Sequence, residues 1–370
     1  MAASRQADYY VGRPGARERV EAREEADMIF EQIATGGCQS YLIGCDATRA
    51  AVLIDPEQSQ VDRYVGLVHQ QGVHVRYIID THTHADHFSA SRALASALQA
   101  PIVMHRLSPA PFVDMRLDDG DMLMVGELRL RALHTPGHTR DSMCLVADDR
   151  VFTGDTLLIG GTGRTDLPSG DPDALYDSLF AKLLELPSEM LVFPAHDYQG
   201  RSHSTIGAEF ADNPRLQKTD RAAFVEMMLH LDMAAPTHLT EALRTNMNGG
   251  KTVAQLLADA ALKVPFMSLA ELHGRIGGNG QDLVILDVRE KEAFDAGHVP
   301  GAIHLPRGQL ELRVNGMLSD PTAKLVTCCE FGKISTLAAA TLHDLGFTRV
   351  SALDGGMKAW TEQGYETQAT

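Results

Sequence analysis

The sequence contains no apolar run that is long enough to span a lipid bilayer. It is also poor in basic residues: 33 lysines and arginines stand against 49 aspartates and glutamates, which gives a formal net charge of −16. An excess of acidic side chains opposes binding to nucleic acids and to anionic membrane surfaces. We therefore expect no nucleic-acid partner and no membrane association, and we interpret the acidic residues as an ordinary solvated surface.

Cysteine is scarce as well, with five residues in 370, an odd number without the spacing of a disulfide framework. Such usage is typical of reduced thiols in a reducing compartment. Residues 1–25 mix arginine with glutamate and aspartate. They lack the apolar core of a secretory signal and the acid-poor composition of a transit peptide. The sequence thus predicts a cytoplasmic protein with a charged N-terminal arm over residues 1–25.

The length of 370 residues exceeds the usual size of one domain, and a hydrophobic share of 44% supports ordinary globular cores. Between residues 26 and 250, short apolar segments alternate with breaks at glycine and proline, which predicts a sheet-rich domain with helices between strands. Strands are expected over 40–44, 51–54, 75–79, 102–105, 122–125, 128–133, 144–147, 151–152 and 191–194. Helices are expected over 61–71, 89–99 and from Asp171-Pro172 onward, where the aspartate is a good cap.

A cluster of metal-ligand types follows the expected strand 75–79. The stretch Thr81-His-Thr-His-Ala-Asp-His87 places three histidines and an aspartate within seven residues. This spacing favours a metal site over a histidine-rich turn. His138, Asp155 and His196 also come at or near the ends of expected strands. Since such loops are held by a rigid sheet edge and open to solvent, we expect these residues to join the same site.

The ordered motifs His82-x-His-x-Asp-His87, Pro-Gly-His138, Gly-Asp155 and Pro-Ala-His196 resemble the metallo-β-lactamase superfamily over roughly residues 25–250. The resemblance implies an αββα sandwich with the metal between the two sheets. It does not fix the reaction, because hydrolases and oxidases share the fold.

One interpretation of the ligand set is a dinuclear zinc site for thioester hydrolysis, as in glyoxalase II, with a water shared by the two ions. The first zinc would then be bound by His82, His84 and His138, the second by Asp86, His87 and His196, with Asp155 as the bridge. All of these residues are present, so the ligand list alone does not exclude this alternative.

Finer motifs resemble the persulfide dioxygenase branch of the superfamily. They are Gly161-Thr-Gly-Arg-Thr-Asp166, Pro-Ala-His-Asp-Tyr198, Asn213-Pro-Arg-Leu216 and Asn246-Met-Asn-Gly-Gly250. This resemblance implies oxidation of glutathione persulfide by O₂ to sulfite and glutathione. It also implies one Fe(II) per chain, bound by His82, His138 and Asp155, a donor set that suits non-haem iron.

The remaining polar residues of the motifs have implied roles around that iron. His84, Asp86, His87 and His196 would orient the iron ligands through hydrogen bonds. Arg164 and Tyr198 would hold the anionic substrate, since an arginine can bind a carboxylate with two parallel hydrogen bonds. A role for Arg164 as a surface-loop cation stays open.

A boundary is expected at residues 248–251, followed by a linker over 251–264 that contains a helix. From about residue 265, strands alternate with helices again, which predicts a small parallel sheet. Strands are expected over 283–289 and 324–328, and a helix over 336–345.

Four motifs of this part resemble a rhodanese domain over residues 265–370. They are Asp-Val-Arg289, Gly297-His-Val-Pro-Gly-Ala302, Cys329-x-x-Gly-x-x-Ser335 and Gly355-Gly-x-x-x-Trp360. The resemblance implies transfer of a sulfane sulfur from thiosulfate or a persulfide to a thiol or sulfite. Backbone N–H groups in a loop that opens a helix form an anion cradle, where a cysteine has a lowered pKa and can carry a persulfide.

Within the loop, the spacing to Gly332 makes Cys329 the nucleophile and Cys328 the last buried residue of the strand. The loop consists of Glu330, Phe331, Gly332, Lys333, Ile334 and Ser335 after the cysteine. Ile334 stands where an arginine often does, which leaves Lys333 as the only cation of the loop. The preference between thiosulfate and glutathione persulfide therefore stays open.

The sequence thus predicts a two-domain α/β enzyme that combines persulfide dioxygenase and sulfurtransferase activities. In the hydrolase alternative, the rhodanese module would serve only binding or regulation. The oligomeric state stays open, a homo-oligomer included.

Overall fold

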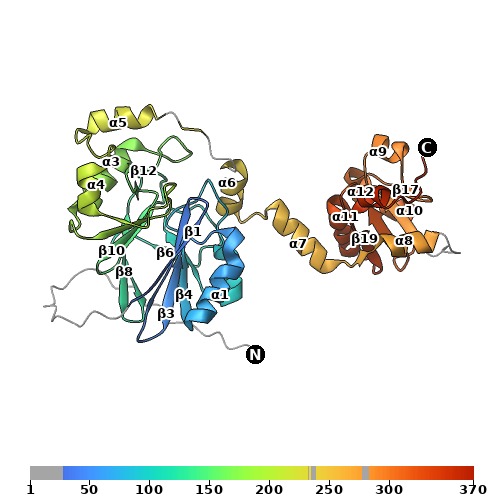
Figure 1. Cartoon of the computed structure of the whole chain (residues 1–370), viewed down its shortest axis with the longest axis horizontal. Coiled ribbons are helices and arrows are strands. Elements are labelled where there is room, and N and C mark those ends of the chain that lie inside the picture. Colours follow the sequence, from blue (N-terminus) through green and yellow to red (C-terminus); the bar gives the residue numbers. More distant parts are fainter. Residues whose placement is uncertain (1–27, 232, 235–238, 277–282) are drawn as a thin grey trace. The chain divides into compact units, whose positions relative to one another are not determined.

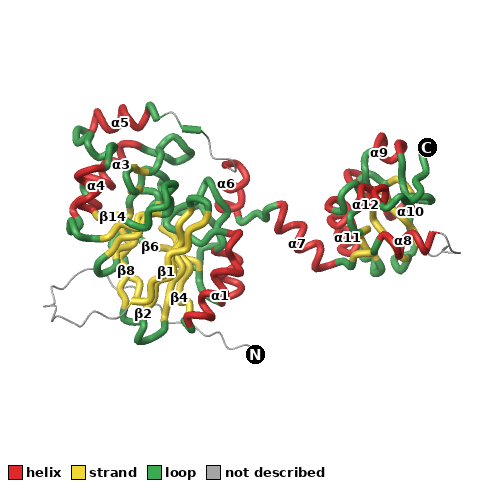
Figure 2. The backbone as a smooth tube through the Cα atoms, viewed as in Figure 1, coloured by secondary structure: helices red, strands yellow, loops and turns green. Residues whose placement is uncertain are grey.

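The computed structural model describes residues 28–231, 233–234, 239–276 and 283–370, and the chain divides into two compact units between Gly250 and Lys251 (Figures 1 and 2). The expected N-terminal arm, residues 1–25, lies outside the described residues. Among the helices described, none is both long and apolar enough to cross a membrane.

The first unit contains two mixed six-stranded sheets. The first sheet has the order β1 (Met28–Thr35), β2 (Cys38–Cys45), β3 (Ala50–Ile54), β4 (His74–Ile79), β5 (Ile102–His105) and β6 (Met115–Leu117). The second has the order β14 (Ser204–Thr205), β13 (Leu191–Pro194), β10 (Arg150–Gly154), β9 (Met143–Val146), β8 (Leu128–His134) and β7 (Met122–Val125). A small hairpin of β11 (Leu157–Leu158) and β12 (Gly161–Thr162) stands apart from both.

Successive side chains of a strand point to opposite faces of its sheet, so that one face packs against the other sheet and the opposite face packs against helices. Tyr41 and Ile43 of β2 face the second sheet, where the Tyr41 ring lies 5.0 Å from that of Phe152, whereas Leu42 faces the helices outside. Helices α1 (Val61–Gln71) and α2 (Ser91–Leu98) pack on the outer face of the first sheet. Helices α3 (Pro172–Phe180), α4 (Ile206–Asp212) and α5 (Arg221–Leu229) cover the second (Figure 1). The result is the predicted αββα sandwich.

Two helices of this unit show the local causes of the fold. The predicted helix 61–71 is confirmed as α1, which buries Tyr64 and Val68 and ends at Gly72 with a φ of 60°. Such a left-handed end is favourable for glycine, which has no Cβ. The predicted cap of α3 is confirmed too, because the Asp171 side chain accepts a hydrogen bond from the N–H of Ala174.

The second unit contains the parallel sheet that the sequence predicts. Its order is β15 (Phe266–Met267), β19 (Val350–Leu353), β18 (Lys324–Cys328), β16 (Leu283–Asp287) and β17 (Ile303–His304), and all neighbours are parallel. The helices around it are α8 (Leu269–Ile276), α9 (Lys291–Ala296), α10 (Leu310–Met317), α11 (Lys333–Asp344) and α12 (Gly356–Glu362). A hydrophobic cluster lies on each face of the sheet.

The segment 251–264, which the sequence predicts as a linker, belongs to the second unit. It forms α7 (Val253–Lys263), which begins with a capping box of Thr252 and Gln255. Ala260 is buried, and the helix packs against α11. The following Val264 joins the core of the second unit. One more helix, α6 (Leu239–Asn248), precedes the boundary in the first unit.

Candidate functional site

Four loops of the first unit carry expected metal ligands, each after the end of a strand. His82 follows β4 of the first sheet. His138, Asp155 and His196 follow β8, β10 and β13 of the second sheet. The candidate metal centre therefore joins both sheets at one edge of the sandwich, as expected from the sequence.

His82, His138 and Asp155 form one group, and their candidate ligand atoms all lie within 4.8 Å of one another. His138 Nε2 is 3.6 Å from Asp155 Oδ2. His82 Nε2 is buried and has no hydrogen-bond partner. An unpaired nitrogen in such a place is costly unless a ligand uses its lone pair. The three side chains are therefore arranged to share one bound ion.

Hydrogen bonds on the far side of each ring fix the tautomers of the two histidines. The Thr81 hydroxyl donates to Asp55 Oδ2 at 2.8 Å, so it can only accept from His82 Nδ1, which is 3.0 Å away. His138 Nδ1 donates to the carbonyl oxygen of Arg164 at 2.8 Å. Both Nε2 atoms are left with free lone pairs, which is the form that binds a metal.

This donor set fits divalent iron. Two neutral imidazoles and one carboxylate are the protein ligands that non-haem Fe(II) sites use, and they leave positions open for reactants. Asp155 Oδ1 lies 2.7 Å from His196 Nδ1, and this hydrogen bond orients the carboxylate. The second oxygen of Asp155 stays directed toward His138.

His84 faces two carboxylates that the sequence analysis missed. Its Nε2 is 3.2 Å from Asp55 Oδ1 and 3.9 Å from Asp80 Oδ1, while its Nδ1 is buried without a partner. Burial raises the pKa of Asp80, although the nearby His84 partly offsets this effect. Asp55 also accepts the N–H of Thr81 at 2.7 Å. Asp55 thus orients His84 directly, and it orients His82 through Thr81.

The position of these two aspartates was a signal that could have revealed them. Asp55 follows β3, and Asp80 follows β4, as directly as Asp155 follows β10.

Asp86, His87 and His196 gather with Cys38 in a second group, whose candidate ligand atoms also lie within 4.8 Å of one another. Asp86 lies between the two histidines, 2.7 Å from His196 Nε2 and 3.1 Å from His87 Nδ1. Cys38 Sγ is 3.5 Å from His196 Nε2 and 3.8 Å from His87 Nδ1. No motif marks Cys38, since its contact with His196 spans 158 residues of sequence.

The carboxylates set the charges of the second group. Burial lowers the pKa of His196, but Asp155 and Asp86 outweigh it and raise this pKa well above its ordinary value. Burial also opposes charge on His87, whose contact with Asp86 nevertheless raises its pKa to about 10. Burial disfavours the thiolate of Cys38, yet hydrogen bonds with His196 and His87 lower its pKa to about 7.

Arg164 forms hydrogen bonds both within its own loop and with a distant segment of the first unit. Its guanidinium makes two hydrogen bonds of 2.6 Å to the Asp166 carboxylate, and it donates to the carbonyl oxygens of Met233 and Ala234 at 3.2 and 2.7 Å. The side chain is only 11% exposed. These contacts favour a structural role that ties the loop to residues 233–234, while the substrate role stays an untested prediction.

Tyr198 lies at the mouth of the site and is 76% exposed. Its ring is nearly parallel to that of His196, with centroids 5.9 Å apart. A Cβ at Gly37 would lie 2.6 Å from the tyrosine ring, so the glycine makes this close approach possible. The predicted position of Tyr198 beside the metal-ligand clusters is thus compatible with contact to a bound substrate.

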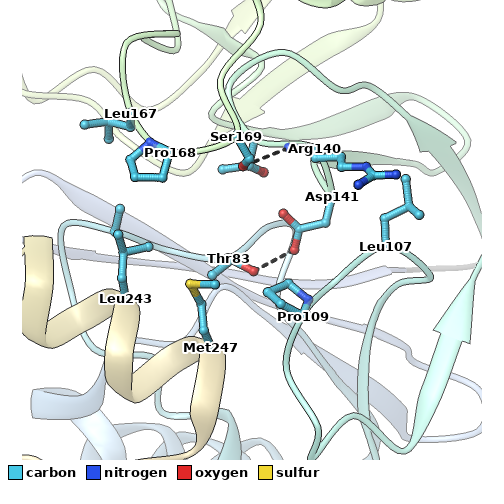
Figure 3. A pocket seen from close by; sticks show the side chains of 12 residues that line it. Thr83, Leu107, Pro109, Arg140, Asp141, Leu167, Pro168, Ser169, Leu243 and Met247 are labelled. Atoms are coloured by element: carbon cyan, nitrogen blue, oxygen red, sulfur yellow. Dashed lines mark hydrogen bonds between the residues drawn. The ribbon is translucent and has the colours of Figure 1, made fainter.

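A cavity of about 220 Å³ lies in the first unit (Figure 3). Helix α6 contributes Leu243 and Met247 to its wall, and the Thr83 hydroxyl donates to Asp141 at 2.7 Å across another side. None of the described residues that line it belongs to the metal-ligand clusters. The cavity is lined instead by residues that alternate with or adjoin the ligands, namely Thr83, Ala85 and Thr139.

In the second unit, β18 delivers Cys329 to a tight loop that opens α11. Gly332 has a φ of 81°, which glycine adopts without strain. The N–H of Ser335 points at Cys329 Sγ from 3.2 Å. Because the Ser335 hydroxyl donates to the Gly332 carbonyl, it accepts from the thiol at 3.3 Å. These donors beside the sulfur would stabilise a thiolate.

The pair Gly355-Gly356 packs against this loop. A Cβ at Gly356 would lie 2.3 Å from the Cys329 carbonyl oxygen, so another residue would force the loop to shift. The same oxygen accepts the N–H of Met357 at 2.8 Å. The glycine motif noted in the sequence therefore holds the cysteine loop in place.

Cys328 and Cys329 face opposite sides of the sheet. Cys328 belongs to the core cluster that contains Trp360, whereas Cys329 belongs to the cluster on the other face. Burial and the nearby Asp287 raise the pKa of Cys328 well above its ordinary value. The contacts of Ser335 with Cys329 and the position of Cys328 on the opposite face agree with the predicted order of the two cysteines, while the catalytic role of Cys329 stays a prediction.

Comparisons with known protein families cover both units. The model described as the metallo-beta-lactamase superfamily matches residues 33–196, and that of the rhodanese-like domain matches residues 268–363. The matched ranges contain the metal-ligand clusters and the cysteine loop, respectively.

The first unit has relatives of substantial identity. Persulfide dioxygenase ETHE1, mitochondrial, from Homo sapiens is 39% identical over 214 residues, which are 57% of this chain and 84% of that protein. The crystal structure of ETHE1 from Myxococcus xanthus is 42% identical and covers 59% of this chain and 98% of that one, with a TM-score of 0.58.

A wider likeness concerns the fold alone. A metallo-beta-lactamase structure from Staphylococcus aureus subsp. aureus COL is 23% identical, with a TM-score of 0.58. It covers 90% of this chain and 99% of that one.

Proposed function

The chain belongs to the persulfide dioxygenase family of the metallo-β-lactamase superfamily and carries a rhodanese domain after it, and we propose that it is a bifunctional enzyme of sulfur metabolism. Its first unit would oxidise glutathione persulfide with O₂ and water to glutathione and sulfite. Its second unit would transfer a sulfane sulfur through Cys329.

The observation that supports the first activity is the group of His82, His138 and Asp155. Its three candidate ligand atoms lie within 4.8 Å of one another in a chain related to persulfide dioxygenases. We propose that they hold one Fe(II) per chain. An Fe(II) held by these three residues would have coordination positions open for reactants.

The surrounding residues would maintain that ligand set. Thr81 and the carbonyl oxygen of Arg164 keep the protons of His82 and His138 on Nδ1, away from the ion. His196 donates to Asp155 Oδ1 and fixes the carboxylate. We propose that Tyr198, exposed at the mouth, contacts the glutathione part of the substrate.

In the second unit, we propose that the Cys329 thiolate attacks the outer sulfur of a persulfide or thiosulfate. The sulfur–sulfur bond of the donor breaks, and a thiolate or sulfite leaves. The N–H of Ser335, 3.2 Å from Sγ, would stabilise the anionic sulfur before and after the transfer. A thiol or sulfite would then accept the sulfur, and sulfite from the first unit is one such acceptor.

The hydrolase alternative keeps one supporting observation. Asp86, His87 and His196 gather beside the first group and offer the ligands that a second zinc would need. Such an enzyme would cleave a thioester of glutathione with a metal-activated water and would consume no O₂.

Oxygen uptake tests the proposal. The purified chain is supplied with glutathione persulfide, and O₂ and sulfite are measured together. We expect one sulfite formed for each O₂ consumed, and no uptake with the His138→Ala variant. Cleavage of a glutathione thioester without O₂ uptake would support the hydrolase instead.

A further inference from the structure

The side chains of the cysteine loop point outward around a buried sulfur. Between Cys329 and Ser335, every residue except Gly332 is exposed. Two of these exposed side chains are large and apolar: Phe331 with 62% and Ile334 with 51% of the surface accessible. Cys329 itself is 2% exposed. Phe331 and Ile334 are thus the exposed apolar side chains of the loop that carries Cys329, next to the charged Glu330 and Lys333, and we call these two the apolar rim.

The charges beside the apolar rim are largely balanced. The Glu330 carboxylate is 3.1 Å from Arg289 Nη1, and Arg289 also pairs at 2.7 Å with the buried Asp287. Two carboxylates thus neutralise this arginine. Two lysines lie beside the loop: Lys333 is the first residue of α11, and the ammonium of Lys358 is 5.8 Å from the centre of the aromatic ring of the rim.

These features suit an organic donor better than thiosulfate. Thiosulfate is a small dianion, and its hydration must be replaced by cations and N–H donors when it binds. Phe331 and Ile334 supply neither, so the donors for either anion are Lys333, Lys358 and the N–H of Ser335, and the two apolar side chains add nothing to the binding of thiosulfate. An organic persulfide instead has a carbon skeleton whose burial against phenylalanine and isoleucine is favourable. The carboxylates of a peptide-like thiol such as glutathione would also match the two lysines.

We propose that Phe331 and Ile334 determine the sulfur donor, favouring an organic persulfide of the glutathione type over thiosulfate. This inference rests on the proposed sulfur transfer through Cys329. The Cys329 thiolate attacks the outer sulfur of R–S–SH, the sulfur–sulfur bond breaks, R–S⁻ leaves, and Cys329 carries S–SH. Atoms and charge balance, and the step needs no oxidant.

The test measures how fast Cys329 acquires one sulfur, by mass spectrometry of the intact chain and of its peptides. The full chain is used without O₂, so that the first unit cannot consume the persulfide. Glutathione persulfide and thiosulfate are compared as donors at equal concentration. The variants are Phe331→Ala and Ile334→Arg. Leu312→Ala, which removes an 87% exposed side chain on α10, is the matched control.

We expect glutathione persulfide to load Cys329 about tenfold faster than thiosulfate. Burial of one or two apolar groups of the donor against the rim is enough to produce a rate ratio of this size. Phe331→Ala should slow loading by the persulfide about fivefold to tenfold and leave thiosulfate unchanged. Ile334→Arg should accelerate thiosulfate, because it adds a cation at the rim. Leu312→Ala should alter neither rate.

Faster loading by thiosulfate, or equal effects of Phe331→Ala on both donors, would overturn the specificity while the sulfur transfer itself stands. Loading by neither donor would overturn the proposed transfer and this inference with it.

Discussion

The metal centre of the first unit and the cysteine loop of the second unit are built in opposite ways. The metal centre collects its residues from strand ends of two sheets, and the contact between Cys38 and His196 joins positions 158 residues apart. The cysteine loop places its central contact, from Ser335 to Cys329, across six residues. The first site exists only when the sandwich is packed, whereas the central contact of the second is local and is supported from outside by the pair Gly355-Gly356.

This difference implies that the two activities can be removed separately. A change in the loop should leave the sandwich and its ligands intact, and a change of a ligand should leave the loop intact. The predictions below test that separation, beginning with the largest effect.

Cys329→Ser should lower sulfur transfer by about 1000-fold or more, because a serine hydroxyl does not replace a thiolate that carries the sulfur. Oxygen uptake with glutathione persulfide should stay unchanged, since the candidate iron ligands lie in the first unit. Both rates are measured on the same preparation. The matched control is Cys328→Ala, which should retain most of the transfer.

Sulfur found by peptide mapping on Cys328 would contradict the assignment of the nucleophile. A loss of oxygen uptake in Cys329→Ser would contradict the independence of the two sites.

The reverse change concerns the proposed iron ligands. His138→Ala and Asp155→Ala should each lower bound iron and oxygen uptake by about 100-fold or more. Loss of a residue that only orients a ligand already lowers metal affinity or activity by about 10- to 100-fold, and loss of the ligand itself should cost more. Sulfur loading of Cys329 should persist. Iron content is measured by elemental analysis, and uptake by an oxygen electrode. A variant that keeps full iron and full uptake would show that the residue is not a ligand.

Asp55→Asn should have a smaller effect, a decrease of about 10- to 100-fold in iron affinity. The asparagine has one acceptor oxygen where Asp55 uses two, for Thr81 and His84. The matched control is Asp62→Asn, an exposed residue of α1, which should bind iron like the parent chain. Iron affinity is measured by competition with a chelator. Equal affinity of both variants would show that Asp55 does not control the ligands.

The sequence allowed more of the cysteine loop to be predicted than of the metal centre. Cys329, Gly332 and Ser335 are neighbours in the sequence, so their spacing was enough to predict the loop that opens α11. The strand ends that carry His82, His138, Asp155 and His196 were also visible, because each follows a clear apolar segment.

The residues that the sequence analysis missed depend on tertiary contacts. Cys38 meets His196 across an isolated bridge between distant segments, and no local pattern encodes this. The contacts of Arg164 with Asp166 and with the carbonyl oxygens of Met233 and Ala234 were not predicted either, while the substrate role that its motif predicts stays untested. Such partners are decided by how the loop packs, which a motif does not show.

Arg164→Ala should therefore produce the smallest effect on catalysis. We expect the free energy of unfolding to fall by about 1–3 kcal/mol, because charged hydrogen bonds are lost. The KM for glutathione persulfide should change by less than about twofold, because an arginine that only stabilises the loop makes no contact with the substrate. Denaturant unfolding and steady-state kinetics measure the two quantities. A tenfold higher KM at unchanged stability would instead give Arg164 the substrate role that its motif predicts.

The metal content of the chain tests the central claim most directly. The claim is that the first unit uses one iron ion, bound by His82, His138 and Asp155, while the second group of ligands remains without a catalytic metal. The chain is purified without chelator, and iron and zinc are counted against protein concentration. We predict about one iron per chain and no stoichiometric zinc, as a mononuclear site requires. About two zinc ions per chain would contradict the claim and support the hydrolase.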